Sequence, residues 1–453
     1  MKTDKLFMYA LISGSLLAAS CNSYLDLKPD KKMAVPSSAS DLQLMLDNYN
    51  LFNSNYPYAF GIMADDYFVT TEHWAALSNQ MTRNLYIWQP DENTAEFWSR
   101  PYTNIYTLNV VLEEAERIVT DPWESAAMTT VKGSALFLRA IQYFALSQLF
   151  TKPYQAEQAD NILGLPLHTQ ADYSVKSVRA SLSDTYELII HDLEQAIRLL
   201  PERSSLESRP SKVAAYGMLS KVYLSMCDYE KAGHYADSCL SRYDRLLDYN
   251  LLDTTANAPI PEFNEEVLFQ MRSTRQSILI NSRAKVDTTL YRLYDKRDIR
   301  SRLFFVHNPD SSIAFKGDYD GRGISSNGYV FSGVITDEMF LIRSECHARQ
   351  NQLEKAADDL NHLLATRWET GKFEPLRFLT ADEAITAILE ERRKQLLFRD
   401  SRWIDIRRLS LDPKYAITPT RQIEGRTYSL DPPDGYVLLI PNYVIERSGI
   451  QQN

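Results

Sequence analysis

The feature that most constrains this chain is a helix-pair pattern, which is clearest over residues 211–243. Apolar residues recur there at spacings of three and four on both sides of Cys227-Asp228, which predicts two helices joined by a tight turn. If Tyr216 is the large residue of a tetratricopeptide repeat, Ala232 falls sixteen residues later, at the small position where the two helices cross. The segment therefore predicts a helical hairpin of the tetratricopeptide type.

Three other stretches carry the same pattern less regularly, and helix pairs are expected near 131–200, 335–366 and 381–409. The pair at 335–366 has Arg343 where the repeat prefers leucine. Four stacked pairs predict a mainly α fold, built as a right-handed solenoid. Because such units bury their faces only by stacking and offer a concave wall to other molecules, the pattern favours binding over catalysis.

Two long stretches between the helix pairs have a different character. Residues 51–100 and 244–335 contain scattered glycine, proline, asparagine and aromatic residues with little helical period, so they predict long loops and short strands. Loops of this length inside a compact protein are usually functional. If the solenoid is a scaffold, we expect the ligand to contact these two insertions.

The N-terminus has the layout of a bacterial lipoprotein signal. Lys2 and Lys5 precede an apolar segment, Leu6–Ala19, which is followed by small residues and then Cys21. The apolar segment is too short to span a bilayer as a helix. We therefore expect residues 1–20 to be removed and Cys21 to carry the lipid, with residues 21–453 forming one domain. An ordinary signal peptide with a chance cysteine and a retained membrane anchor remain as alternatives.

Charge and cysteine content narrow the classes of ligand. The formal net charge is −10, so nucleic acid and anionic lipid headgroups are poor ligands, and neutral or cationic molecules fit better. Cys227 and Cys239 fall on neighbouring predicted helices, where they form either one disulfide or two buried small residues. Neither the cysteines nor the seven histidines have the spacing of a metal site.

Several segments in a fixed order, spread over the chain after Cys21, resemble one known family. They are Tyr24-Leu25-Asp26-Leu27-Lys28-Pro29, Phe97-Trp98, Phe137-Leu138-Arg139-Ala140, Gly164-Leu165-Pro166-Leu167, Glu390-Glu391-Arg392-Arg393-Lys394 and Arg402-Trp403-Ile404-Asp405-Ile406-Arg407-Arg408. With these segments the chain resembles the SusD/RagB family, the surface nutrient-binding lipoproteins of Bacteroidetes. It departs from that pattern in being shorter than many members and in its loose closing segment, Tyr443-Val444-Ile445-Glu446-Arg447.

The resemblance implies a fold and a role. The implied fold is a bundle of eight helices, forming four tetratricopeptide units, with an irregular region packed against it. The implied role is capture of an oligo- or polysaccharide, or in some members a peptide, at the outer face of the outer membrane. The implied partner is a TonB-dependent transporter of the SusC type, which the lipoprotein covers as a lid. Because a shorter chain implies shorter loops, the ligand of a family member is a weak guide to the ligand of this chain.

Binding candidates come from aromatic and polar residues in the two insertions, because a sugar ring presents both an apolar face and hydroxyl groups. Trp74 is the first choice, beside donors and acceptors of the same insertion. The full candidate set is His73, Trp74 and Arg83 in the first insertion and Tyr291, Tyr294, Tyr319, Arg322 and Tyr329 in the second.

Two conspicuous segments are expected to be structural. The charged residues from Glu391 to Arg407 predict ion pairs and packing between the last helices, because opposite charges recur there at helical spacing. Trp98, Tyr102 and Ile105 form one helical stripe, which predicts a core face.

Other functions have less support. Asp318-Tyr319-Asp320-Gly321 hints at calcium but lacks the remaining ligands of a full loop, so no cofactor is expected. A glycoside hydrolase would need two carboxylates across a cleft, and Asp65 or Asp66 with Asp318 or Asp320 are the candidates for that role. A scaffold that holds the transporter without a ligand site of its own is a further alternative.

Overall fold

The computed structural model of this chain describes residues 36–119, 121–323, 328–431 and 434–453. Residues Ala39–Asn453 form the compact unit to which the following description applies. The predicted signal peptide and Cys21 lie outside the described residues.

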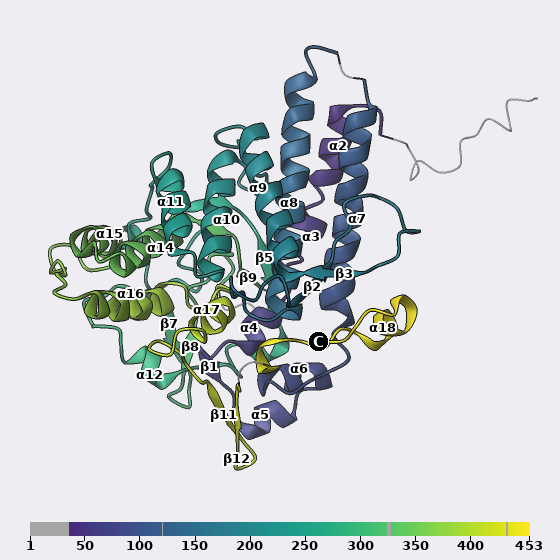
Figure 1. Cartoon of the computed structure of the whole chain (residues 1–453). Helices are drawn as coiled ribbons and strands as arrows, with labels where there is room; N and C mark the ends of the chain where they lie inside the picture. Colours follow the sequence, from purple (N-terminus) through teal and green to yellow (C-terminus); the bar gives the residue numbers. More distant parts are fainter. Residues whose placement is uncertain (1–35, 120, 324–327, 432–433) are drawn as a thin grey trace, which may run out of the picture. The chain divides into compact units, whose positions relative to one another are not determined.

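Long helices follow one another across this unit, and each packs against the next in the chain (Figure 1). In order, they are α7 (Ala95–Arg117), α8 (Ser125–Phe150), α9 (Leu182–Leu199), α10 (Lys212–Ser225), α11 (Tyr229–Leu240), α14 (Thr336–Arg349), α15 (Leu353–Ala365) and α16 (Ala381–Gln395). The helix pairs expected from the sequence correspond to α8–α9, α10–α11, α14–α15 and α16 with α17 (Arg402–Leu409). The mainly α fold is confirmed.

Equivalent contacts recur in two of the pairs. The Ser220 hydroxyl of α10 donates to the Ala232 carbonyl of α11 at 2.9 Å, and the Ser344 hydroxyl of α14 donates to the Ala356 carbonyl of α15 at 2.7 Å. Both alanines are fully buried, so the helices approach closely at the small position that the repeat predicts. The matched geometry supports the tetratricopeptide register set from Tyr216.

Side-chain caps fix where the helices begin. Ser181 and Asp184 form a reciprocal capping box at the start of α9. Ser211 caps α10 by accepting from the amide of Ala214, and Asp228 caps α11 by accepting from the amide of Lys231. These caps set the first residues of α9, α10 and α11, close to where the sequence pattern predicts that the helices begin.

The remaining elements are short. The helices are α2 (Ala39–Leu46), α3 (Tyr49–Phe52), α4 (Ala59–Met63), α5 (Thr71–Ala75), α6 (Gln80–Tyr86), α12 (Thr288–Tyr291), α13 (Arg300–Leu303) and α18 (Asn442–Ser448), with 3-10 turns η3 (Tyr249–Leu251), η4 (Ser277–Leu279) and η5 (Asp434–Tyr436). The strands are β1 (Tyr67–Phe68), β2 (Leu163–Pro166), β3 (Arg179–Ser181), β4 (Val267–Phe269), β5 (Arg272–Thr274), β6 (Lys285–Val286), β7 (Phe305–His307), β8 (Ile313–Phe315), β9 (Tyr329–Phe331), β10 (Val334–Ile335), β11 (Thr420–Ile423) and β12 (Arg426–Ser429).

The strands pair two by two and always antiparallel: β1 with β6, β2 with β3, β4 with β10, β5 with β9, β7 with β8 and β11 with β12. The β1–β6 pair joins the first insertion to the second, since Tyr67 lies opposite Val286. The amide of Asp287 also donates to the carbonyl of Asp66 at 2.9 Å. The two stretches expected to form loops are therefore one irregular region.

One expectation about this region needs correction. Residues 51–100 do not consist of loops and short strands, because α4, α5 and α6 and the first turns of α7 occupy much of that range. These helices are short, so their apolar residues give too few repeats for a helical period to stand out in the sequence. The second insertion does consist mainly of short strands and loops.

The core has two parts. The larger cluster follows the helices and includes residues of α4, α6 and the C-terminal segment. The smaller cluster is formed by the second insertion together with Leu397. Cys227, Cys239 and Cys346 are free, so the alternative of a Cys227–Cys239 disulfide does not hold in this structure. Across the described ranges, no helix is both long and apolar enough to cross a bilayer.

Candidate functional site

The first-insertion candidates lie together on α5 and α6. The Thr70 hydroxyl caps α5 through the amide of His73, which places Trp74 on the next position of a short helix. The indole N–H of Trp74 donates to the carbonyl of Arg83 at 3.1 Å. The structure thus brings Trp74 and Arg83 together and fixes the orientation of a half-buried indole ring.

Arg83 is itself held in place. Its guanidinium donates to the carbonyl of Leu77 and to the side chain of Gln80. Among the described residues, the buried Nδ1 of His73 has no hydrogen-bond partner. Exposed polar residues surround this group, including Thr71, Glu72, Asn79 and Gln80. An immobilised aromatic ring beside polar side chains suits a sugar, because little ordering remains to be done on binding.

The second-insertion candidates fall into separate groups. The Arg322 guanidinium carbon lies 5.2 Å from the ring centroid of Tyr329, and that of Arg272 lies 3.8 Å from the same ring. Tyr291 packs instead edge-on against Phe305, with ring centroids 5.1 Å apart. Arg322 and Tyr329 are therefore neighbours at the surface, whereas Tyr291 is half-buried in another cluster.

Two candidates are removed from the set by their burial. Tyr319 is fully buried, and its hydroxyl donates to Glu266 at 2.7 Å. Tyr294 is buried as well, and its hydroxyl donates to the carbonyl of Lys394 at 2.8 Å. Neither ring offers a face to a ligand in this structure. The second insertion has its own core, and these tyrosines supply part of the apolar area that it buries.

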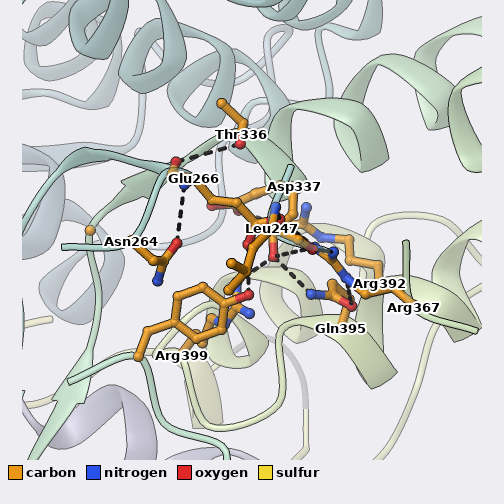
Figure 2. A network of polar contacts seen from close by, with 12 residues as sticks. Leu247, Asn264, Glu266, Thr336, Asp337, Arg367, Arg392, Gln395 and Arg399 are labelled. Carbon is orange, nitrogen blue, oxygen red and sulfur yellow. Dashed lines mark hydrogen bonds and ion pairs between the residues drawn. The ribbon is translucent and has the colours of Figure 1, made fainter. Parts of the chain in front are cut away.

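A network of buried charges joins the irregular region to the last helices (Figure 2). Arg367 contacts Glu266 at 2.5 Å, donates to the carbonyl of Leu247 at 2.7 Å, and donates to Gln395 at 3.2 Å. Arg399 contacts Asp337 at 2.7 Å. These groups come from the second insertion, the end of α15, the start of α14 and the end of α16, so the network links segments far apart in the sequence.

The electrostatics of the network follow from its burial. Burial raises the pKa of Glu266, although the charge of Arg367 opposes that rise. Burial acts on Asp337 in the same way, but the guanidiniums of Arg399 and Arg367 outweigh it and lower the pKa of Asp337. Each of these charged side chains has an oppositely charged partner inside the protein, so we interpret the network as structural.

The charged motif at the end of the chain is also structural, as the sequence indicates. Arg392 contacts Asp405 and Glu338, each at 2.8 Å. Arg408 contacts Glu345 at 2.8 Å, and Arg300 of the second insertion contacts Glu391 at 2.7 Å. The interpretation as ion pairs and packing between the last helices is confirmed.

Comparison with known proteins supports the family indicated by the sequence. A family model described as "SusD-like_3: Starch-binding associating with outer membrane" matches residues 23–224. A curated relative named SusD-like protein P2, from Formosa agariphila, is 25% identical over 392 residues, which cover 71% of this chain and 73% of the relative. By these matches the chain is similar to the SusD/RagB family. A shorter match, 27% identical over 143 residues, is to a SusD-like protein of Bacteroides ovatus; it covers 32% of this chain and 24% of that protein.

Solved structures support the SusD fold. A SusD superfamily protein from Bacteroides thetaiotaomicron matches with a TM-score of 0.73 at 20% identity, over 92% of this chain and 99% of the other. A laminarin-binding SusD-like protein matches with a TM-score of 0.64 at 18% identity, over 91% of this chain and 97% of the other. At these identities the likeness concerns the fold alone.

Three of the four carboxylates considered for hydrolysis lie beside arginine side chains. The Arg402 guanidinium donates two hydrogen bonds to the Asp65 carboxylate, at 2.5 and 2.9 Å. Burial alone would raise the pKa of Asp65, but Arg402 outweighs it and holds that pKa well below its usual range. Burial and the charge of Asp65 raise the pKa of Asp66 to about 6. Asp318 contacts a different cation, Arg275, at 2.9 Å.

The segment Asp318-Tyr319-Asp320-Gly321, which only hinted at calcium, uses its carboxylates for backbone contacts. Asp320 accepts from the amides of Arg322 at 2.9 Å and Tyr329 at 2.8 Å. Asp318 accepts from the amides of Asp320 and Phe331. Within the described part of the chain, no group of three or more His, Cys, Asp or Glu side chains could hold a metal ion.

An aromatic cavity of about 240 Å³ along α7 was not predicted from the sequence. Trp98 and Ile105 are buried as predicted, but Tyr102 and Tyr106 are half-buried and line this cavity. The signal was present, because Trp98, Tyr102 and Tyr106 recur at a spacing of four, but an apolar stripe looks the same whether it faces a core or a cavity.

Proposed function

We propose that this protein is a cell-surface lipoprotein that captures a glycan and passes it to a SusC-like TonB-dependent transporter in the outer membrane. The matched family is described as starch-binding and associated with the outer membrane. Solved proteins of the same fold include a SusD-like carbohydrate-binding protein from Bacteroides vulgatus and the laminarin-binding protein. These relatives support a neutral oligo- or polysaccharide as the ligand of this chain.

The observation that carries the proposal is the fixed indole of Trp74. Its N–H donates to the Arg83 carbonyl, and the half-buried ring packs against the core while part of its surface stays open beside polar side chains of α5 and α6. A sugar stacks its apolar face on such a ring while its hydroxyls contact the polar neighbours. Arg322 and Tyr329 are a second contact group for a longer chain.

The proposal assigns binding without catalysis. Of the four carboxylates considered for hydrolysis, Asp65 and Asp318 pair with separate arginines, Arg402 and Arg275. Asp66 lies 3.7 Å from Arg393, and Asp320 accepts hydrogen bonds from backbone amides. A glycosidase keeps one carboxyl group available as acid and a second one facing the sugar across a shared cleft. Incubation of the protein with every glycan that it binds, followed by analysis for shortened products, tests this part; released fragments would contradict it.

The ligand test is calorimetry of purified residues 22–453 against plant, host and microbial glycans, with a peptide panel beside it. We expect saturable binding to one glycan class, weakened at least about tenfold by Trp74→Ala, because a buried aromatic anchor typically contributes that much. Trp123→Ala is the matched control, since Trp123 is 76% exposed between α7 and α8. Binding of peptides alone, or of no panel member by a folded protein, would refute glycan capture.

The anchor and the partner have their own test. Lipid on Cys21 would tether the protein, and a diacylglyceryl group plus an amide-linked chain is enough for stable anchoring. We expect Cys21→Ala to leave the fold intact and to release the protein from the membrane fraction. Affinity purification of the anchored protein should recover a TonB-dependent transporter; retention of Cys21→Ala in the membrane, or recovery of no transporter, would contradict the respective claim.

A further inference from the structure

The aromatic cavity lies between three segments of the fold. One wall is α7, which supplies Trp98, Tyr102 and Tyr106 at a spacing of four, so that all three lie on one helix face. The opposite wall is the segment after β2, up to Ser177, and the third side comes from the C-terminal segment through Val444 and Ile450. The Tyr443 hydroxyl of α18 contacts the Ser99 hydroxyl, in keeping with the place of α18 beside one end of α7 (Figure 1).

The buried ion pair between Arg139 and Asp192 stabilises the wall of the cavity through Asn109. The amide nitrogen of Asn109 donates to the carbonyls of His168 and Gln170, at 3.0 and 3.1 Å. Its oxygen accepts from Arg139 at 2.8 Å, and Arg139 pairs with the fully buried Asp192 at 2.7 Å. The segment after β2 is therefore tied to α7 and α8 before any ligand arrives, which makes the cavity a preformed site.

The aromatic pair Tyr106 and Tyr173 lines the solvent-facing side of the cavity. The rings of Tyr106 and Tyr173 stack with centroids 4.0 Å apart and planes 20° apart. Tyr173 is nonetheless 80% exposed, so burial of apolar area in the core does not account for its position. One ring face of Tyr173 is covered by Tyr106, and most of the remaining surface is open to solvent.

The polar groups of the cavity match a neutral ligand. The Nε2 of His168 lies 3.1 Å from the hydroxyl of Ser177, and partial burial lowers the pKa of His168, so its ring is uncharged at neutral pH. Hydrogen bonds from Ser174 hold the pKa of Asp172 below its usual range, so its carboxylate accepts hydrogen bonds. The described lining residues include no lysine or arginine, and an anionic ligand would be repelled by Asp172.

We propose that this cavity is a second carbohydrate-binding site, which takes one pyranose ring of a neutral glycan against the Tyr106–Tyr173 pair. A pyranose has an apolar face for the ring pair and equatorial hydroxyls for Asp172, Gln170 and the His168–Ser177 pair. The volume is smaller than the roughly 300–1,000 Å³ of pockets that enclose drug-sized ligands, which favours a single ring over a longer segment. The ligand class rests on the proposed function, whereas the site itself is separate from α5 and α6.

A second site would change how a long glycan binds. Two weak contacts on one chain raise its apparent affinity well beyond either alone, because the second contact becomes intramolecular. We therefore expect polysaccharides to lose more affinity than hexasaccharides when the cavity is altered.

The test is calorimetry of residues 22–453 with maltohexaose, laminarihexaose, xylohexaose and mannohexaose, and with trigalacturonate as the anionic probe. We expect Tyr173→Ala and Tyr106→Ala to weaken a bound neutral hexasaccharide by about 3- to 10-fold, the loss of one aromatic contact. Tyr173→Phe keeps the ring and should bind like the wild type. Tyr235→Ala is the matched control, since Tyr235 stacks on Tyr223 at 5.4 Å on α10 and α11.

The outcomes separate the two proposals. If the wild type binds a hexasaccharide and both cavity variants bind it equally well, the second site is refuted and the Trp74 proposal stands. If the cavity variants weaken binding while Trp74→Ala does not, the cavity is a sugar site and the Trp74 assignment fails. Preference for trigalacturonate over the neutral hexasaccharides would overturn the neutral-sugar assignment. A wild type that binds no glycan would overturn both proposals.

Discussion

Replacement of Arg367 by methionine tests the buried network that holds the irregular region on the helices. Arg367 is fully buried, contacts Glu266 at 2.5 Å and donates to the carbonyl of Leu247 at 2.7 Å. Methionine fills much of the space of the arginine stem, so the main change is that Glu266 loses its cation. Removing one partner of a buried pair typically costs about 3–5 kcal/mol, because the other charge stays buried without compensation.

The pH dependence of the loss gives the sharper check. Burial already raises the pKa of Glu266 against the effect of Arg367, and removal of Arg367 will raise it further. A carboxyl group with a raised pKa in the folded state favours folding most when it is protonated, below its unfolded value of about 4.3. Its contribution is lost as the pH rises toward the folded pKa. The deficit of Arg367→Met should therefore be smaller at pH 5 than at pH 8.

Urea unfolding of residues 22–453, followed by far-UV circular dichroism at both pH values, measures the effect. The double variant Arg367→Met/Glu266→Gln should recover part of the lost stability, because the uncompensated charge is gone. Arg297→Met, which removes the exposed Arg297–Asp295 pair, should behave like the wild type. A loss below about 1 kcal/mol for Arg367→Met, or a loss equal at pH 5 and pH 8, would refute the reasoning.

Three further predictions concern buried groups outside this network. Burial raises the pKa of Asp400 to about 7, so wild-type stability should fall as the pH rises from about 4 to 7, and Asp400→Asn should flatten that slope in urea unfolding across this range. Gly333→Ala should destabilise by about 1–3 kcal/mol in the same assay, because a Cβ there would lie 2.1 Å from the Phe269 carbonyl oxygen; a stability equal to the wild type would contradict this close approach. Tyr319→Phe should lower stability by about 1–2 kcal/mol through its lost bond to Glu266 and leave glycan affinity unchanged in calorimetry; a weaker affinity would return Tyr319 to the binding set.

The helices were predictable because their evidence is local. Tyr216 and Ala232 lie sixteen residues apart, and the spacing alone placed α10 and α11 and their crossing point. Opposite charges at helical spacing likewise predicted that Arg392 and Asp405 are structural, and they pair at 2.8 Å. In both cases the interacting residues are close in sequence or share a periodic element.

The candidate site was predictable only in part. Trp74 and Arg83 are nine residues apart, and they do meet. Tyr319 and Tyr329 are ten residues apart, yet Tyr319 is fully buried and Tyr329 is partly exposed. In irregular segments no period relates a position to a face, so the burial of each side chain depends on which distant strand packs against it.

The sequence by itself indicated the family and determined the helix pairs and the structural role of the charged motif of α16 and α17, because these follow from periodicity and motif order along the chain. Tertiary structure alone decided which aromatic residues are open to a ligand. It also formed the aromatic cavity, in which Tyr106 meets Tyr173 across 67 positions of sequence and the C-terminal segment closes the third side. A stripe of apolar residues predicts only that this face of the helix is buried. Whether the face packs against a core or lines a cavity depends on how completely the opposite segments fill the space.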